Sequence, residues 1–437
     1  MKKIVTGMLY ICLVACVFPC PAFGVRRVSP PEFESGYTLP TPITPAPRNP
    51  LYEYVDVLVL FCTLLLAAYY ALKSRSRQGI FLLMLFCILY FGFWKKGCVC
   101  SVGSIQNVAL ALFHPAYSLP LSVLLFFMLP LLAALFFGRV FCGAVCPIGA
   151  LQDIVAFHPL KVPQWADHAL SLVPAVYLGI AVLYAATGSH FLICRFDPAV
   201  SFFRLTGPAP MLFFGALFLC VSMCVARPYC RFLCPYGVLL RWCSRLSKWH
   251  IAITPDECIQ CRLCEESCPF GAIKKPREEC RGQSRKELRR TLLLIVALPL
   301  IIALGAVIGR TLAFPLSYAD ARVRLAEQLW REDSGKEAEL TLESETFRSM
   351  GRQVADLYKE VRLLQKQFQV GGMVLGGFLG LTFGGTLIFL SLCRKGSDYE
   401  PDRGLCLSCG RCFAYCPREH LRLKTGKEKN EAAHQNS

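Results

Sequence analysis

The sequence predicts an all-α, polytopic membrane protein with a small split α+β ferredoxin domain, carrying two 4Fe–4S clusters, on its cytoplasmic face. Three observations lead to this prediction. Of the 437 residues, 54% are hydrophobic and 18% are charged, whereas soluble domains carry about 25% charged residues. Long apolar runs recur along the chain. Two identical cysteine patterns, each typical of a ligand run for a 4Fe–4S cluster, stand far apart in the sequence.

The net charge of +17 could indicate a nucleic-acid partner, but Lys and Arg also gather on the cytoplasmic side of membrane proteins. No basic soluble domain with interleaved aromatic residues supports nucleic-acid binding, so we predict no such partner. The 25 cysteines are grouped too regularly for a disulfide scaffold. Thiolate clusters are built in a reducing compartment, which places the grouped cysteines in the cytoplasm.

Residues 1–24 have a Lys-Lys start, a short apolar core and small residues at the end, which is the pattern of a signal peptide. The stretch "LVAC", ending at Cys16, also resembles a lipoprotein cleavage box. Lipidation of Cys16, ordinary cleavage and an uncleaved anchor therefore all remain open. Residues 25–53 are proline-rich and predict an extended linker outside the membrane.

Seven apolar runs follow, and most reach the length of a spanning helix, about 17–25 residues. They lie at about 54–72, 79–94, 118–137, 169–187, 209–226, 291–309 and 370–392. With the N-terminus outside, the basic segments "KSRSRQ" and "RKELRR" both fall inside, in agreement with the positive-inside rule. We therefore predict a multi-pass protein of the bacterial inner membrane, with a five-span domain over 54–250 and a two-span hairpin over 291–392.

Residues 318–369 of this hairpin are expected outside, as an antiparallel pair of helices. Apolar residues recur there at spacings of four and three, the stripe of a packed helix pair. This stripe consists of Met350, Val354, Leu357, Val361, Leu364 and Phe368, and its expected partners are Val323, Ala326 and Leu329, with "EDSGKE" as the turn. The pair could serve as a spacer or as a dimerisation arm.

Two complete ligand runs carry the strongest signal. "CIQCRLCEESCP" lies in a first ferredoxin half, 251–280, and "CLSCGRCFAYCP" in a second half, 398–423, before a polar tail, 424–437. In two-cluster ferredoxins the fourth cysteine of each run ligates the cluster held mainly by the other run. The expected ligand sets are Cys258, Cys261, Cys264 and Cys416 for one cluster and Cys406, Cys409, Cys412 and Cys268 for the other. Structural zinc is the alternative, although zinc sites rarely show two identical four-cysteine runs.

Two shorter motifs share the pattern Cys-x3-Cys-Pro. "GRVFCGAVCPIGALQD" contains Cys142 and Cys146, and "RPYCRFLCPYGVLL" contains Cys230 and Cys234. Each motif follows an inward-running span, and a three-residue gap is about one helical turn, which would place both sulfurs of a pair on one side. The four cysteines could ligate a third iron–sulfur centre, each pair could be a redox dithiol, or all could be structural residues of tight turns.

Three more cysteines are expected on the opposite face. Cys98 and Cys100 follow the second span, and Cys194 follows the fourth. A bilayer core about 30 Å thick would separate them from the clusters, a long gap for electrons without a relay. They could bind a metal centre or a flavin as an outer redox site. Alternatively, Cys194 could form a disulfide with one of the other two, since Cys98 and Cys100 are too close in sequence to pair easily, or all three could be free thiols in tight turns.

Together, "CGAVCPIGALQD", "CRFLCPYGVLL" and the two ferredoxin runs resemble the NosR/NapH-type membrane polyferredoxins, with CcoG-like proteins as more distant relatives. The resemblance covers roughly residues 80–275 and the tail. It implies respiratory electron transfer between the quinone pool or a cytoplasmic donor and a periplasmic or membrane redox protein. The flavin-carrying outer domain of NosR and its Ser/Thr-Gly-Ala-Thr site are missing, so covalent FMN is not expected.

The sequence thus predicts a membrane-bound iron–sulfur electron carrier that has no catalytic residues of its own. The alternative is a redox-sensing or assembly factor for another membrane redox enzyme, as the CcoG-like resemblance implies. A carrier must be reoxidised continuously, whereas an assembly factor is needed only while its client matures. The sequence contains no Walker loop, hydrolase elbow or dinucleotide fingerprint, so ATP-driven transport and NAD chemistry have no support.

Overall fold

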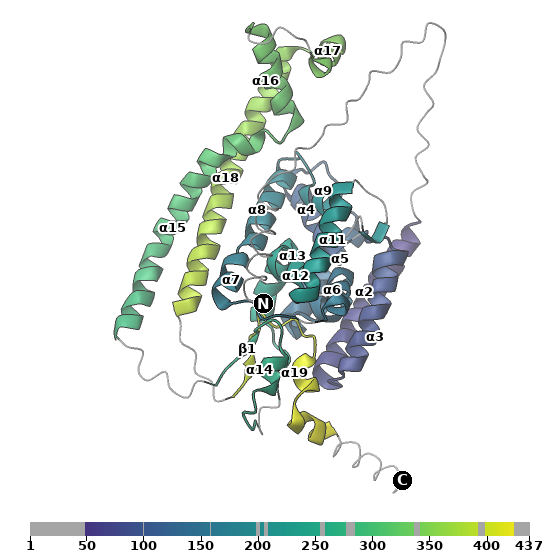
Figure 1. Ribbon diagram of the computed structural model, residues 1–437. Helices are drawn as coiled ribbons and strands as arrows, with labels where there is room; N and C mark the ends of the chain where they lie inside the picture. Colours follow the sequence, from purple (N-terminus) through teal and green to yellow (C-terminus); the bar gives the residue numbers. More distant parts are fainter. Residues whose placement is uncertain are drawn as a thin grey trace. The chain divides into compact units, whose positions relative to one another are not determined.

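The computed structural model describes residues 49–98, 100–157, 159–197, 202–204, 209–253, 258–276, 285–335, 341–391 and 398–423. The predicted signal peptide with Cys16, the linker up to residue 48 and the polar tail lie outside these residues. The described chain is mainly helical (Figure 1).

The first part of the chain forms short and long helices up to the first cysteine run. These are α2 (Pro50–Ala68), η1 (Tyr69–Lys73), α3 (Arg77–Cys87), η2 (Ile88–Trp94), α4 (Ser101–Phe113), α5 (Leu121–Phe137), η3 (Phe141–Val145), α6 (Pro147–Val155), α7 (Gln164–Leu170), α8 (Val173–Ala186), α9 (Leu192–Phe196), α11 (Ala209–Cys224), α12 (Pro228–Phe232) and α13 (Pro235–Arg245). The elements η1, η2 and η3 are π-helical turns.

The rest of the chain contains the two cysteine runs and the hairpin between them. Its elements are α14 (Leu263–Ser267), β1 (Ile273–Lys274), α15 (Arg285–Ser317), α16 (Ala321–Asp333), α17 (Leu342–Ser349), α18 (Val354–Ser391), β2 (Glu400–Pro401) and α19 (Arg411–Ala414).

Five helices among the described residues are long and apolar enough to cross a membrane, which indicates a membrane protein. They are Leu51–Lys73, Arg77–Trp94, Trp165–Ala186, Arg289–Ser317 and Val354–Ser391. The third and fifth predicted spans correspond to the shorter apolar helices α5 and α11. The first span begins earlier than predicted, inside the expected linker, because the Asn49 side chain caps α2 and Pro50 suits its first turn.

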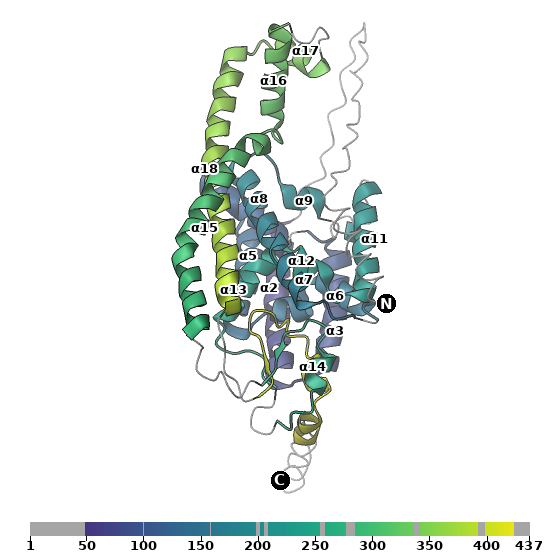
Figure 2. The same ribbon diagram turned by 60° about the vertical axis from the view of Figure 1, so that its left-hand side comes forward.

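The helices α15 and α18 form a close-packed hairpin between the two cysteine runs. A Cβ on Gly376 would strike the carbonyl oxygen of Gly305, and one on Gly372 would meet Gly309. Such small residues let two apolar helices approach until their backbones touch. In both ribbon views α16 and α17 lie at the end of this hairpin that is opposite α14 and α19 (Figures 1 and 2). The hairpin therefore carries the chain away from the first cysteine run and back to the second.

The predicted apolar stripe is buried at this far end, except that Val354 is only partly buried and Met350 is exposed. The buried side chains there include Val323, Ala326 and Leu329 of α16 and Leu357, Val361, Leu364 and Phe368 of α18. Met350 was expected on the same stripe but is 68% exposed. The reason is that α17, a helix not predicted from the sequence, ends at Ser349, and the chain turns at Gly351, with φ +68°, before α18 begins. One continuous helix, α18, then forms both the arm that packs against α16 and the last predicted span.

The two cysteine runs meet at the near end. Strand β1 pairs antiparallel with β2, with Ile273 opposite Pro401. Beside this pair, the Asp402 backbone N–H donates to Ala272, and Lys274 forms an ion pair of 2.7 Å with Asp402. Segments that are far apart in sequence are thereby held side by side.

Candidate iron–sulfur sites

Two cavities at this junction are lined by cysteines from both runs. The first cysteine pocket, of about 360 Å³, is lined by Cys258, Cys261, Cys264 and Cys416. The second cysteine pocket, of about 350 Å³, is lined by Cys406, Cys409, Cys412 and Cys268. Each pocket thus combines three cysteines of one run with the last cysteine of the other, and these are the two sets expected from the sequence.

The two runs share an unusual backbone conformation. Gln260 and Arg262 have φ values of 52° and 63°, and the corresponding residues Ser408 and Gly410 have φ values of 54° and 76°. For residues other than glycine this conformation is strained, and such strain is concentrated at functional sites. Alternation of right-handed and left-handed residues turns successive backbone N–H groups toward one concave side, which suits anionic iron–sulfur clusters.

The chemistry of the pockets also fits a cluster. Burial raises the pKa of the Cys264 thiol to about 11 and that of Cys406 to about 12. These thiols therefore become thiolates near neutral pH only when a metal centre supplies positive charge. No three His, Cys, Asp or Glu side chains within the described ranges are arranged to hold a single metal ion. A four-iron cluster instead spreads its ligands around a cavity, as they lie here.

The cysteines of the Cys-x3-Cys-Pro motifs form a further group, which we call the membrane cysteine site. All four are buried and come from two separate segments: Cys142, Cys146, Cys230 and Cys234. The Cys146 thiol interacts electrostatically with that of Cys230, and the Cys234 thiol with those of Cys146 and Cys142. The two cysteines of a pair were expected to share one helical turn. In the first motif they do not, because Cys142 lies in the π-helical η3 whereas Cys146 precedes α6.

The second cysteine of each motif caps a helix in the same way. Cys146 is the N-cap of α6 and Cys234 is the N-cap of α13, and each is followed by a proline that suits the first turn. Both residues have an extended backbone, with φ values of −66° and −62°, and neither side chain makes a capping hydrogen bond. Both sulfurs therefore lie at helix N-termini, where the helix dipole favours thiolates.

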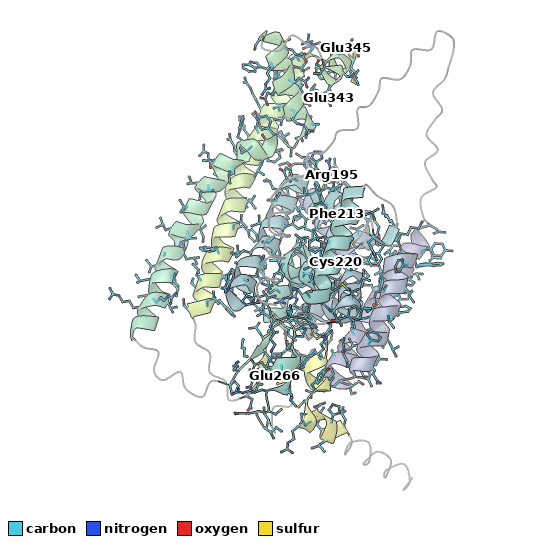
Figure 3. The ribbon with its side chains drawn as sticks, viewed as in Figure 1. Arg195, Phe213, Cys220, Glu266, Glu343 and Glu345 are labelled. Carbon is cyan, nitrogen blue, oxygen red and sulfur yellow. The ribbon has the colours of Figure 1, made fainter. Side chains whose placement is uncertain are left out.

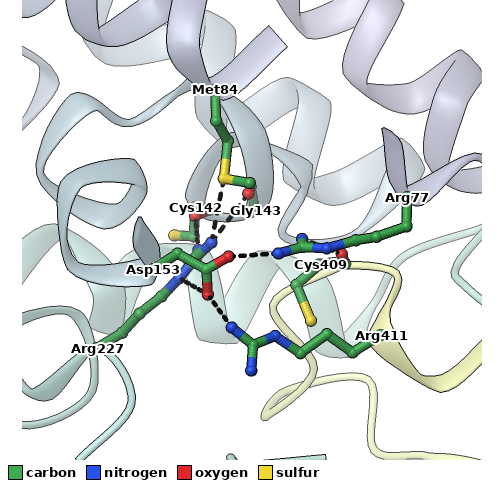
Figure 4. Close-up of polar contacts among 8 residues, drawn as sticks. All are labelled: Arg77, Met84, Cys142, Gly143, Asp153, Arg227, Cys409 and Arg411. Atoms are coloured by element: carbon green, nitrogen blue, oxygen red, sulfur yellow. Dashed lines mark hydrogen bonds and ion pairs between the residues drawn. The ribbon is translucent and has the colours of Figure 1, made fainter. Parts of the chain in front are cut away.

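A buried ion-pair network connects this site to the second cysteine pocket (Figure 4). The Asp153 carboxylate, almost fully buried, contacts Arg77 at 2.6 Å, Arg227 at 3.4 Å and Arg411 at 3.1 Å. Burial alone would raise the pKa of Asp153, but the guanidinium groups, Arg227 foremost, lower the pKa below its usual value. Arg411 belongs to the second pocket and Arg227 donates to the Cys142 carbonyl, so Asp153 links the two sites.

Backbone contacts bring the same two sites together. A Cβ on Gly143 would strike the carbonyl oxygen of Leu407 and would lie 2.9 Å from that of Ser408. Arg77 donates to the Cys409 carbonyl at 2.6 Å. The loop that forms the second cysteine pocket thus lies directly against η3, which carries Cys142. The sequence analysis missed Gly143, Asp153 and Arg227. An aspartate within an apolar motif and an arginine next to a Cys-Pro loop were the available signals.

The contact at Gly143 makes a testable prediction. Gly143→Ala should push the loop of residues 406–410 away from η3, because backbone atoms on the facing loop cannot rotate aside. We expect a loss of about 1–3 kcal/mol in unfolding free energy and faster amide hydrogen exchange in that loop. Gly385→Ala is the control, since a Cβ there meets nothing within 4 Å. Equal exchange in both variants would contradict a close contact at Gly143.

The predicted outer cysteines also lie close together. Both the Cys100 and the Cys194 sulfur lie 3.3 Å from the position that a Cβ on Gly103 would take, so they are at most twice that distance apart. Cys98 interacts electrostatically with both. Cys100 lines an apolar cavity of about 560 Å³ together with Cys146. The outer cysteines are therefore nearer to the membrane cysteine site than a full bilayer core would place them.

Comparisons with known families support iron–sulfur binding. A family model described as a 4Fe-4S binding domain matches residues 119–163 and 206–254, which contain both Cys-x3-Cys-Pro motifs. A second model with the same description matches residues 251–274, which contain the first cysteine run. The chain therefore has 4Fe–4S-binding domains of the ferredoxin type.

Three curated proteins match parts of the chain. "Putative electron transport protein YccM" of Escherichia coli is 31% identical over 118 residues, 25% of this chain and 33% of that protein. Two uncharacterised proteins of Methanocaldococcus jannaschii also match. MJ0749 is 38% identical over 55 residues, 13% of this chain and 22% of that protein. MJ0750 is 31% identical over 101 residues, 23% of this chain and 38% of that protein. The matches thus span less than two fifths of each relative. No solved structure matches the chain.

Proposed function

We propose that this chain is an iron–sulfur electron carrier of the bacterial inner membrane, with a split two-cluster ferredoxin domain on the cytoplasmic side. The observation that carries the proposal is the exchange of cysteines between the two pockets. Cys416 completes the set of the first run, and Cys268 completes the set of the second. This arrangement is typical of two-cluster ferredoxins, which transfer single electrons.

The membrane cysteine site holds the third cluster in this proposal. Its four thiols converge from two loops, both within residues matched by a 4Fe-4S binding model. The loop of the second pocket contacts η3 beside Cys142. Electrons would therefore pass from the first pocket to the second pocket and on to the membrane cysteine site, or in the reverse direction.

A quinone is the proposed partner inside the membrane, and a cytoplasmic electron donor and a respiratory redox protein are the proposed partners outside it. The apolar cavity of about 560 Å³ has Cys146 in its wall, together with the rings of Phe91, Phe126 and Phe141. Small-molecule sites are typically lined by apolar and aromatic side chains with a few polar groups. A quinone ring bound there would lie next to the third cluster.

The experiment is a comparison of two reductants on the anaerobic, purified protein. A short-chain quinol and dithionite should both bleach the cluster absorption of the wild type. Leu60→Trp, at a buried residue that lines the cavity, should slow reduction by quinol at least about tenfold while dithionite still reduces the clusters. Leu58→Trp is the control, because Leu58 is 59% exposed on the same helix. If Leu60→Trp is reduced by quinol as fast as the control, this cavity is not the quinone site.

A further inference from the structure

The outer cysteines repeat the membrane cysteine site in sequence. Residues 100–107 read "CSVGSIQN" and residues 146–153 read "CPIGALQD", with Cys, Gly and Gln at the same positions. Residues 194–198 read "CRFDP", which resembles "CRFLCP" at 230–235, and Asp197 stands before the proline in place of the second cysteine. A further cysteine precedes each of the two segments that begin at Cys100 and Cys146: Cys98 precedes the former, and Cys142 precedes the latter. The outer set is therefore three cysteines and one aspartate.

The position of a cysteine at a helix N-terminus is repeated as well. Cys100 is the N-cap of α4, a 13-residue helix, and its sulfur accepts the Gly103 N–H at 3.2 Å. Cys146 is likewise the extended N-cap residue of α6, although its side chain makes no capping hydrogen bond. A sulfur is thus held at the N-terminus of a helix in both places.

The approach of a second cysteine is the same in both places. A Cβ on Gly103 would lie 3.3 Å from the Cys194 sulfur, and one on Gly149 would lie 3.4 Å from the Cys230 sulfur. In each case the missing glycine side chain leaves space for a cysteine from another segment beside the capping cysteine.

A buried glutamine provides an independent sign of a ligand. Gln106 is fully buried, and its Oε1 accepts the Cys194 backbone N–H at 3.2 Å. Its Nε2 finds no acceptor among the described residues. Buried amides left without a partner are costly, and the sulfide of a cluster beside Cys194 would accept this hydrogen bond.

Asp197 occupies the place of the fourth ligand. It is 2% exposed and interacts electrostatically with Cys100 and Cys194. It also accepts a hydrogen bond of 3.3 Å from the hydroxyl of Tyr229, the residue before Cys230. A carboxylate can ligate iron, as it does in other iron proteins.

We propose that Cys98, Cys100, Cys194 and Asp197 bind a fourth iron–sulfur cluster, of the four-iron type. The proposal extends the proposed function and rests on it, because this cluster would be the last centre of the same electron path. Cys100 shares a cavity with Cys146 of the membrane cysteine site. Figure 3 shows Arg195, the neighbour of Cys194, at the end of the helices opposite Glu266, which lies in the first cysteine run. Electrons would thus leave at the end opposite the two cysteine pockets.

The test is iron analysis and Mössbauer spectroscopy of the full chain, purified anaerobically. The double variant Cys100→Ala/Cys194→Ala should contain about four fewer irons than the wild type and lose one spectral component. The double variant Cys62→Ala/Cys220→Ala is the control, since both cysteines are exposed on α2 and α11, away from these sites. Iron equal to that of the control, zinc in the wild type, or a Cys100–Cys194 disulfide found by mass spectrometry would overturn the proposal.

A second variant tests the aspartate ligand. Asp197→Cys should keep the iron content and change the spectrum of one cluster only, because a thiolate would replace a carboxylate. An unchanged spectrum would overturn the assignment of Asp197. The outcomes also separate this proposal from the proposed function. If only the outer-cluster proposal is wrong, the wild type still shows the spectral signals of clusters in the two cysteine pockets. If the proposed function is wrong, the wild type lacks these signals.

Discussion

Cys416→Ala is expected to abolish the cluster held by the other cysteine run, about 150 residues earlier in the chain. In the structure Cys416 lines the first cysteine pocket with Cys258, Cys261 and Cys264. Removal of one of four ligands should lower the iron content by up to about four per chain. The electron paramagnetic resonance spectrum of the reduced variant should match that of Cys261→Ala.

Comparison with two other variants shows which of the two pockets has lost its cluster. The spectrum of Cys416→Ala should differ from that of Cys409→Ala, which alters the second pocket. Cys268→Ala should show the reciprocal result and match Cys409→Ala. Cys243→Ala is the control, because Cys243 lies on α13 and lines neither pocket. If Cys416→Ala instead matches Cys409→Ala, each run binds its own cluster and ligand exchange is wrong.

Asp153→Asn is expected to have the largest effect on stability. The substitution removes the charge that balances Arg77, Arg227 and Arg411 in a buried position. Removal of one partner from a buried ion pair typically costs about 3–5 kcal/mol. We expect thermal unfolding of the purified protein at a clearly lower temperature, with earlier release of the second pocket from the membrane helices. Asp356→Asn is the control, since its ion pair with Lys359 is exposed and such pairs contribute about 1 kcal/mol or less.

The same carboxylate makes the stability depend on pH. Because the folded-state pKa of Asp153 is lowered, its contribution is complete above the ordinary value, about 3.9, and is lost as the pH falls toward the lower folded-state value. The difference in stability between wild type and Asp153→Asn should therefore be constant from neutral pH to about pH 5 and shrink below about pH 4. A stability difference that stays constant below about pH 4 as well would show that Asp153 is not ionised in the folded protein.

The grouping of the eight cysteines around two pockets could be predicted from the sequence because a ferredoxin ligand run has fixed spacings, and cluster ligation by these cysteines stays a prediction. The sequence was also sufficient for the long apolar helices, whose length follows from the bilayer. Local geometry was harder to predict. The position of Met350 on a continuous stripe was wrong because a helix end and a turn at Gly351 interrupt the pattern. The Cys-x3-Cys gap is a π-helical turn followed by a helix cap, which spacing alone does not distinguish from an α-helical turn.

The charged network was missed because its members are far apart in sequence. The network joins residues from four segments, and its ion pairs form only when the helices pack together. These residues are Arg77, Asp153, Arg227 and Arg411. The repeat between "CSVGSIQN" and "CPIGALQD" was present in the sequence. Its significance became visible only when Cys100 and Cys146 proved to be the N-cap residues of α4 and α6.

Whether the grouped cysteines bind iron–sulfur clusters is decided by the content of iron, acid-labile sulfide and zinc in the anaerobically purified chain. The two cysteine pockets should contribute about eight irons and an equal amount of sulfide, the membrane cysteine site about four more of each, and the proposed outer cluster a further four of each. We expect less than one zinc ion per chain. An iron content near four, or zinc in place of iron without sulfide, would contradict the paired clusters and the electron-carrier function with them.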